Sequence, residues 1–157
     1  MTEQNEFAEA VRALLAAHYE NVTARNVVSD SELGFSQDVW NALGEMNVQG
    51  LVFAEQYGGL EASVEDLAAV LAEVGRVLAP EPLLDAVFLP GFLVERLGTE
   101  EQKERILSAV STGELLLAVA HEEYGSRWPS IRVETKASGN TLTGVKFPVA
   151  AGPSADI

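Results

Sequence analysis

The sequence predicts an α+β protein, in which a bundle of helices is followed by a few strands. Apolar residues recur at helical spacing through the first two thirds of the chain, and after Gly113 they occur in short continuous or alternating runs. Helical and strand-like segments follow each other as two blocks, which favours segregated units over an alternating α/β sheet. We therefore expect a helical domain over residues 1–113 and the start of a β-domain over residues 114–157.

The first helices are predicted from apolar stripes and from residues that cap helix ends. Residues 7–18 carry one stripe, and Ser36 is placed to cap a second helix. A third helix follows the turn at Gly58-Gly59 and begins at Ser63, where Asp66 completes a capping box. The stripes consist of Phe7, Val11, Leu14, Leu15 and His18, then Val39, Trp40 and Leu43, then Leu67, Val70, Leu71, Val74, Val77 and Leu78. We expect His18, at the end of the first stripe, to be partly buried.

Two more helices precede the strands. Residues 81–97 are apolar on nearly every side, which is typical of a helix buried among others, and Pro90-Gly91 is expected to kink or split it. Thr99 and Gln102 form a second capping box, and Gly113 ends the helix that follows.

Three runs are candidate strands. Residues 114–123 are continuously apolar before two Glu, residues 131–137 alternate, and residues 141–150 form the third run. Gly139-Asn140 is a turn signal between the last two. Three uncovered strands would leave an open edge, so we expect further chain or a second chain to complete them.

Composition excludes several classes of partner and site. A net charge of −14 opposes nucleic-acid binding, and no polybasic segment is present for a membrane surface. The chain has no cysteine, and its two His have no neighbouring metal-ligand spacing, so we expect no metal site. The N-terminus lacks the features of a signal peptide, and no apolar run is long enough to cross a membrane. A cytoplasmic protein that does not contact membranes is the expectation.

The residues around position 125 combine several groups that can do chemistry. Glu122-Glu123 is a possible acid/base pair, although neighbours on a strand point to opposite faces. Gly125-Ser126 can offer backbone N–H groups to an anion, and Arg127 can pair a phosphate. A solvent-exposed strand end with a surface Arg explains the same residues without a ligand, so these residues alone name no reaction.

Motifs from about residue 35 to the end resemble the acyl-CoA dehydrogenases. The family's Trp-x-x-Leu stretch with Gly-Leu, its Glu-x-Tyr-Gly-Gly turn and its Glu-x-Gly-Arg helix end all occur in order. The matching residues are Trp40, Leu43, Gly50, Leu51, Glu55, Tyr57, Gly58, Gly59, Glu73, Gly75 and Arg76. The segments "LGTEEQKERILSAVSTGELLLAVAHEE" and "VETKASGNTLTGVKFPVAAGPSAD" are similar to later parts of the same family.

This resemblance implies a helical domain followed by the opening strands of an incomplete β-barrel. It also implies FAD as cofactor, an acyl-CoA thioester as substrate and α,β-dehydrogenation as the reaction. The implied flavin contacts are Glu122, Glu123, Gly125, Ser126, Pro148, Val149 and Ala150, with Ser126 and Arg127 near the substrate. The family's catalytic carboxylate lies in a later domain, so no residue of this chain is nominated as the base, and the chain alone is expected to be inactive.

Two departures from the family pattern leave the role of the chain open. The turn usually written Thr-Glu-Pro-Gly-x-Gly-Ser-Asp is about two residues short, with Tyr124 near the Pro position. The later Lys-x-Trp-Ile-(Thr/Ser) motif reads Lys146-Phe147-Pro148-Val149-Ala150. These features resemble the smaller subunits of two-gene acyl-CoA dehydrogenases that act on pimeloyl or steroid side-chain thioesters. A partner subunit is therefore expected, and the chain is either part of a catalytic unit or a non-catalytic scaffold for one.

Overall fold

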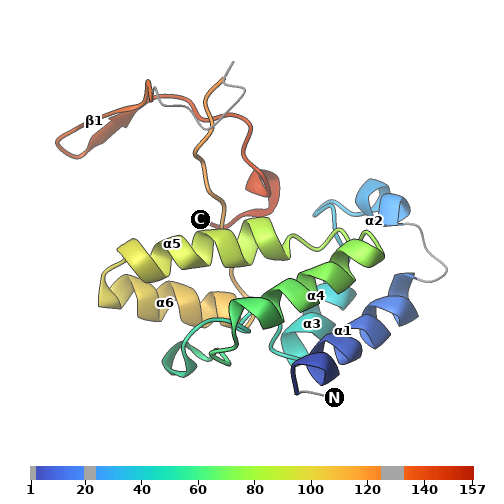
Figure 1. Ribbon diagram of the computed structural model, residues 1–157. Coiled ribbons are helices and arrows are strands. Elements are labelled where there is room, and N and C mark those ends of the chain that lie inside the picture. The colour runs from blue at the N-terminus through green and yellow to red at the C-terminus, as the bar shows by residue number, and fades with distance from the viewer. Residues whose placement is uncertain (1–2, 20–23, 125–132) are drawn as a thin grey trace.

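The computed structural model describes residues 3–19, 24–124 and 133–157. Helices form the body of the molecule, and a small hairpin projects from one side (Figure 1). The α-helices are α1 (Glu3–Tyr19), α2 (Ala24–Asp30), α3 (Gln37–Glu45), α4 (Val64–Arg76), α5 (Leu89–Leu97) and α6 (Glu100–Ser111). The strands are β1 (Lys136–Ser138) and β2 (Thr141–Thr143), and short helical turns are η1 (Glu55–Tyr57), η2 (Leu84–Phe88) and η3 (Gly152–Ser154). The predicted α+β class is confirmed.

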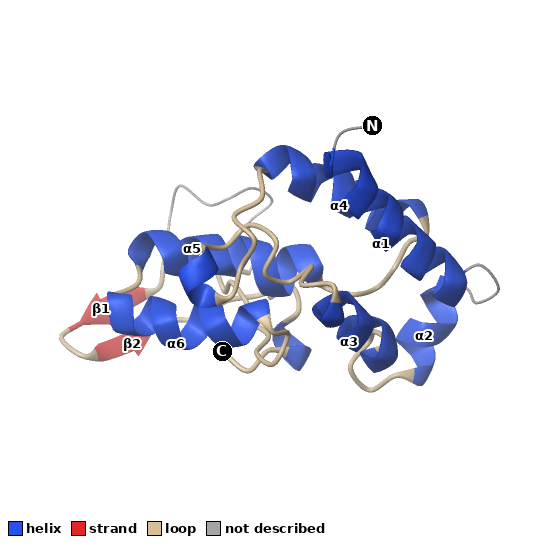
Figure 2. Cartoon of the chain, turned by 90° about the horizontal axis from the view of Figure 1, so that it is seen from below, coloured by secondary structure: helices blue, strands red, loops and turns tan. Residues whose placement is uncertain are grey.

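Helices α1 and α4 pack side by side (Figures 1 and 2). Val11 and Leu15 of α1 and Val70 of α4 are almost fully buried. A carboxylate on α4 joins the two helices at their edge, because Glu73 accepts hydrogen bonds from Arg12 at 2.6 and 2.8 Å and from Arg76 at 2.7 Å. These two guanidinium groups lower the pKa of Glu73 to about 2.

The far end of α1 differs from the sequence prediction. His18 is exposed, and the neighbouring Tyr19 occupies the buried position, with an exposed fraction of 7%. The Tyr19 hydroxyl donates to the carboxylate of Glu81, which is only 4% exposed and also accepts from the backbone N–H of Ser36. Helical spacing places both His18 and Tyr19 near the apolar stripe. Tyr19 takes the buried position because its hydroxyl bonds the buried Glu81, which is 62 residues away in the sequence.

All three predicted N-terminal caps form. The Ser36 hydroxyl accepts from Val39 N–H, and both capping boxes, Ser63 with Asp66 and Thr99 with Gln102, are complete. The Gly58-Gly59 turn is also confirmed: Gly58 has φ +80°, and a Cβ on Gly59 would lie 2.0 Å from the Phe53 carbonyl oxygen. This turn folds residues 46–62 back over the core, where Phe53 and Trp40 are buried.

The apolar helix at 81–97 departs from regular α-helix before its proline. Residues Leu84–Phe88 form a π-helical turn that runs directly into α5. Leu83 and Phe88, five residues apart, are both buried, and Leu84 and Leu89, also five apart, are both exposed. Five residues of α-helix would rotate a side chain by about 140°, so only the wider turn keeps these pairs on one face.

Pro90 has a further effect on how the chain continues after α6. Because proline has no N–H, it cannot bond the carbonyl of Ala86 four residues earlier. That carbonyl instead accepts from Leu117 N–H at 2.9 Å. Pro90, which was predicted to kink or split the helix, thus makes the Ala86 carbonyl available to the extended chain after α6, which binds it through Leu117 N–H.

The strand region is less regular than predicted. Residues 115–123 are extended beside residues 147–157 and share backbone hydrogen bonds with them at Leu116, Ala118 and Glu122, but they form no regular strand. The β1 and β2 strands are three residues each, pair antiparallel from Lys136 opposite Thr143 to Ser138 opposite Thr141, and enclose the predicted Gly139-Asn140 turn. All six strand residues are exposed, so no packed core extends the ladder at its ends.

Candidate functional site

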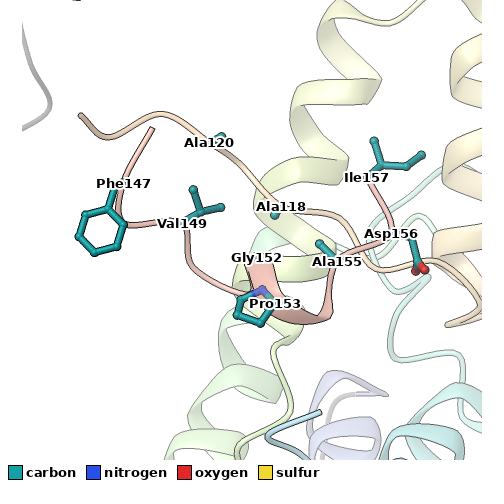
Figure 3. A pocket seen from close by; sticks show the side chains of 9 residues that line it. All are labelled: Ala118, Ala120, Phe147, Val149, Gly152, Pro153, Ala155, Asp156 and Ile157. Carbon is teal, nitrogen blue, oxygen red and sulfur yellow. The ribbon is translucent and has the colours of Figure 1, made fainter. Parts of the chain in front are cut away.

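The two extended segments beside α5 enclose an open groove of about 540 Å³ (Figure 3). Alternate residues at the extended parts of both segments line it, as the two-residue period of extended chain allows. These are Ala118 and Ala120 on one side and Phe147 and Val149 on the other. The remaining lining residues are Gly152, Pro153, Ala155, Asp156 and Ile157. The groove is therefore mainly apolar, with one carboxylate at its edge.

One backbone hydrogen bond brings the two predicted cofactor-contact segments together. Phe147 N–H donates to the Glu122 carbonyl oxygen at 2.9 Å. Tyr124 and Phe147 extend this contact, with ring centroids 6.1 Å apart. The Glu122 carboxylate is half exposed and lies 3.6 Å from Nε2 of His121. Residues 122–124 and 147–149, which are far apart in sequence, are thus neighbours beside the groove.

The three predicted residues at 148–150 differ in their surroundings. Val149 is partly buried and lines the groove, whereas Pro148 and Ala150 are exposed. The peptide bond between Phe147 and Pro148 is cis. A ligand in the groove would therefore meet the side chains of Phe147 and Val149 first.

Glu123 lies in a different environment from Glu122, because its side chain is only 11% exposed. Its Oε1 accepts from Lys146 Nζ at 2.8 Å and from the hydroxyl and N–H of Thr135 at 2.7 and 3.0 Å, and its Oε2 accepts from Glu134 N–H at 2.7 Å. Together, led by Lys146, these donors lower the pKa of Glu123 to about 2. We call Glu123, Thr135, Lys146 and the Glu134 N–H the Glu123 cluster.

The remaining predicted residues of the first turn are Gly125, Ser126 and Arg127. They lie outside the described part of the chain, which resumes at residue 133. Their roles as cofactor-binding and substrate-binding residues stay predictions.

Thr135 was not selected from the sequence, and Lys146 and Phe147 were named only as part of the motif at 146–150, with no contact assigned to them. Each acts through a partner 12 to 25 residues away, and a single sequence does not specify such pairings. The one available signal is weak: Glu123 and Lys146 carry opposite charges on the first and third expected strands, and opposite charges favour each other where two strands pair.

Within the described residues, no group of three or more His, Cys, Asp or Glu is placed to hold a metal ion. The helices of the same ranges include none that is long and apolar enough to cross a membrane.

Comparison with known proteins assigns the chain to a family. The family described as "Acyl-CoA dehydrogenase, N-terminal domain" matches residues 1–114, which is well over half of the chain. The chain belongs to the acyl-CoA dehydrogenase family. The curated protein "Acyl-CoA dehydrogenase IpdE2" of Mycolicibacterium smegmatis is 28% identical over 144 residues, which cover 91% of this chain and 45% of that protein.

Solved structures also share the fold over nearly all of this chain. A chain of a Tcur3481–Tcur3483 steroid ACAD variant superposes with a TM-score of 0.82 at 26% identity, covering 98% of this chain and 42% of that one. A chain of the ChsE4–ChsE5 complex from Mycobacterium tuberculosis gives 0.81 at 25% identity, covering 99% and 43%. The present acyl-CoA dehydrogenase chain thus spans less than half the length of these relatives.

Proposed function

We propose that this chain forms the N-terminal part of an FAD-dependent acyl-CoA dehydrogenase that introduces an α,β double bond into an acyl-CoA thioester. The observation that carries the proposal is the Phe147–Glu122 hydrogen bond, which joins the two predicted flavin-contact segments beside an apolar groove in a chain of this family. The relatives named as steroid ACAD favour a bulky, largely apolar acyl group.

The groove fits part of what a flavin needs. Phe147, Val149, Ala118 and Ala120 offer apolar side chains against which a flat ring can pack. When bound, the flavin supplies hydride acceptance. This chain would hold the ring through Val149 and the 148–150 backbone, exclude water with Phe147, and position Glu122 at the rim. The base that removes the α-proton would come from residues beyond those in this chain.

The experiment is to express the complete protein with any partner subunit with which it co-purifies. Bound flavin would be measured by absorbance after denaturation, and turnover by reduction of a dye with a panel of acyl-CoA thioesters. We expect flavin in the complex, thioester-dependent turnover, and weaker flavin retention in Val149→Asp. A complex that holds flavin but converts no thioester would contradict the proposed reaction, and one without flavin would contradict the proposed cofactor.

A second candidate is a non-catalytic subunit that stabilises a catalytic acyl-CoA dehydrogenase. It is favoured by the stretch at 148–150, where Pro148 and Ala150 stand at the positions of the Trp and the hydroxyl residue in the family motif. The ChsE4–ChsE5 relative is itself described as a complex. Counting flavins per subunit in the purified assembly distinguishes the two roles. One flavin for each copy of this chain, lost in Val149→Asp, supports the catalytic part, and flavin unaffected by Val149→Asp supports the scaffold.

A further inference from the structure

We propose that Glu123 is a positioning residue, whose carboxylate fixes the 121–124 segment against the Lys146–Val149 segment and so holds the two sides of the proposed flavin surface in register. This inference rests on the proposed function for what the surface binds. It reassigns Glu123, which the family resemblance nominates as a direct cofactor contact.

The hydrogen bonds of the Glu123 carboxylate are already made within the chain. Oε1 has three donors, from Thr135 twice and from Lys146, and Oε2 has the Glu134 N–H. A carboxylate has about four lone-pair sites, so little capacity remains for a ligand. Its side chain is also 11% exposed, compared with 44% for the neighbouring Glu122, which makes no comparable set of bonds with the described residues.

The segments that these bonds connect are the ones that carry the groove. Lys146 directly precedes Phe147, which lines the groove and bonds Glu122, and Lys146 Nζ also lies 3.4 Å from the His121 carbonyl oxygen. A displacement of Lys146 would therefore shift Phe147 and, two residues on, Val149. The Glu123 carboxylate therefore affects the shape of the groove through Lys146, without contacting a ligand bound in the groove.

Within the part of the chain that the structure describes, the hairpin has few other contacts to hold it in place. Its two strands are three residues long and exposed throughout, and isolated two-stranded hairpins are marginally stable in water. The Glu123 cluster joins the base of the hairpin, at Glu134 and Thr135, to the segments on both sides of it. One ionised side chain thus substitutes for the packed core that the hairpin lacks.

The test compares four variants of the complete protein, with any partner subunit that co-purifies. Glu123→Gln replaces one acceptor oxygen by an NH₂ group that faces N–H donors, and Lys146→Met removes the ammonium. Lys146→Arg restores a cation as the conservative rescue. Glu134→Gln is the matched control, because it removes a carboxylate from the same hairpin while leaving the Glu134 N–H bond to Glu123 in place.

Two readouts are measured on each variant: amide hydrogen exchange at residues 134, 135 and 147, and the flavin dissociation constant. For Glu123→Gln and Lys146→Met we expect exchange about tenfold or more faster and a higher dissociation constant, with an unchanged unfolding midpoint of the helical domain. Lys146→Arg is expected to bring the exchange rates and the flavin dissociation constant most of the way back to the wild-type values, and Glu134→Gln to match the wild type in both. Thr135→Val, which removes one donor, serves if Glu123→Gln does not fold.

The outcomes separate this inference from the proposed function. Absence of flavin in the wild type would refute the cofactor, and the exchange data would still decide whether Glu123 orders the two segments. Weaker flavin binding in Glu123→Gln with unchanged exchange would overturn the inference in favour of direct contact. Unchanged exchange and unchanged flavin binding would overturn it as well.

Discussion

At the scale of single residues, the surroundings of two buried carboxylates, Glu73 and Glu81, shift their pKa values in opposite directions. Glu73, flanked by two guanidinium groups, has a pKa lowered to about 2 and stays ionised. Burial raises the pKa of Glu81, and hydrogen bonds from Tyr19 and Ser36 oppose that shift only in part. The charges that face Glu81 include the neighbouring His18, and its Oε2 has no hydrogen-bond partner among the described residues. The two sites therefore respond to pH in opposite directions.

We predict that Glu81→Gln makes the protein more stable than the wild type at high pH. Because the folded-state pKa of Glu81 lies above its unfolded value of about 4.3, its contribution to stability is complete below that value and is lost as the pH rises through the folded-state pKa. An amide stays neutral throughout this window. Urea denaturation between pH 4 and pH 8 should show the difference between Gln and wild type growing with pH.

The exposed Glu104→Gln on α6 is the control for the loss of one negative charge. A stability difference for Glu81→Gln that stays constant from pH 4 to pH 8 would show that Glu81 titrates alike in both states, contrary to the buried geometry.

At the scale of elements, much of the helical domain followed from local sequence signals. Ser36, Ser63 and Thr99 cap their helices as predicted, because a cap and its target N–H are three residues apart. The π-helical turn at Leu84–Phe88 and the short strands could not be predicted in this way. Their form depends on partners far along the chain, such as the packing of Leu83 and Phe88 or the pairing of residues 116–122 with 147–157.

The candidate site could likewise be predicted only in part. The sequence and the family resemblance selected Glu122 and residues 148–150, which the structure places near the groove. They did not select Thr135 and gave Lys146 no contact, because the roles of both residues arise from bonds with Glu123 across 12 and 23 residues. Helix α2 was also absent from the prediction, since its seven residues carry no clear apolar stripe.

Pro90→Ala tests the attachment of the extended chain to α5. Alanine provides an N–H that can donate to the Ala86 carbonyl and compete with Leu117 N–H. We expect hydrogen exchange at the Leu117 amide to become about five- to tenfold faster, which corresponds to the loss of one hydrogen bond of about 1 kcal/mol. Pro82→Ala, at the start of the same helical segment, should leave Leu117 exchange unchanged; equal effects from both variants would reject the role given to Pro90.

At the scale of the whole molecule, the C-terminal residues connect the β-region to the helical body. Leu116 N–H donates to the Asp156 carboxylate at 2.9 Å, while Asp156 N–H donates to the Leu116 carbonyl at 2.8 Å. Ser154 donates its hydroxyl to the Leu33 carbonyl at 2.9 Å, beyond the end of α2. The Ser154–Leu33 bond crosses between the two blocks that the sequence predicts as separate domains, as does the Leu117–Ala86 bond, whereas the Leu116–Asp156 bonds hold the C-terminal residues against the segment after α6.

Asp156→Ala removes the bond between the C-terminal residues and Leu116, and we expect it to lower the free energy of unfolding by about 1 kcal/mol. Asp156→Asn keeps an oxygen acceptor for Leu116 N–H and should lose less than half as much. Chemical denaturation of the complete protein measures both values. Equal losses for Ala and Asn would show that charge, and not the hydrogen bond, is what Asp156 contributes.

The wide turn at Leu84–Phe88 has a consequence for how this segment can change in descent. Its five-residue repeat is equivalent to one residue inserted into an ordinary helix, so a lineage that loses one residue there would rotate everything before it by about 100° relative to α5. Glu81, three residues before the turn, would then leave its position opposite Tyr19. The length of the π-helical turn and the buried Glu81 are therefore coupled, and related sequences should have both features or neither.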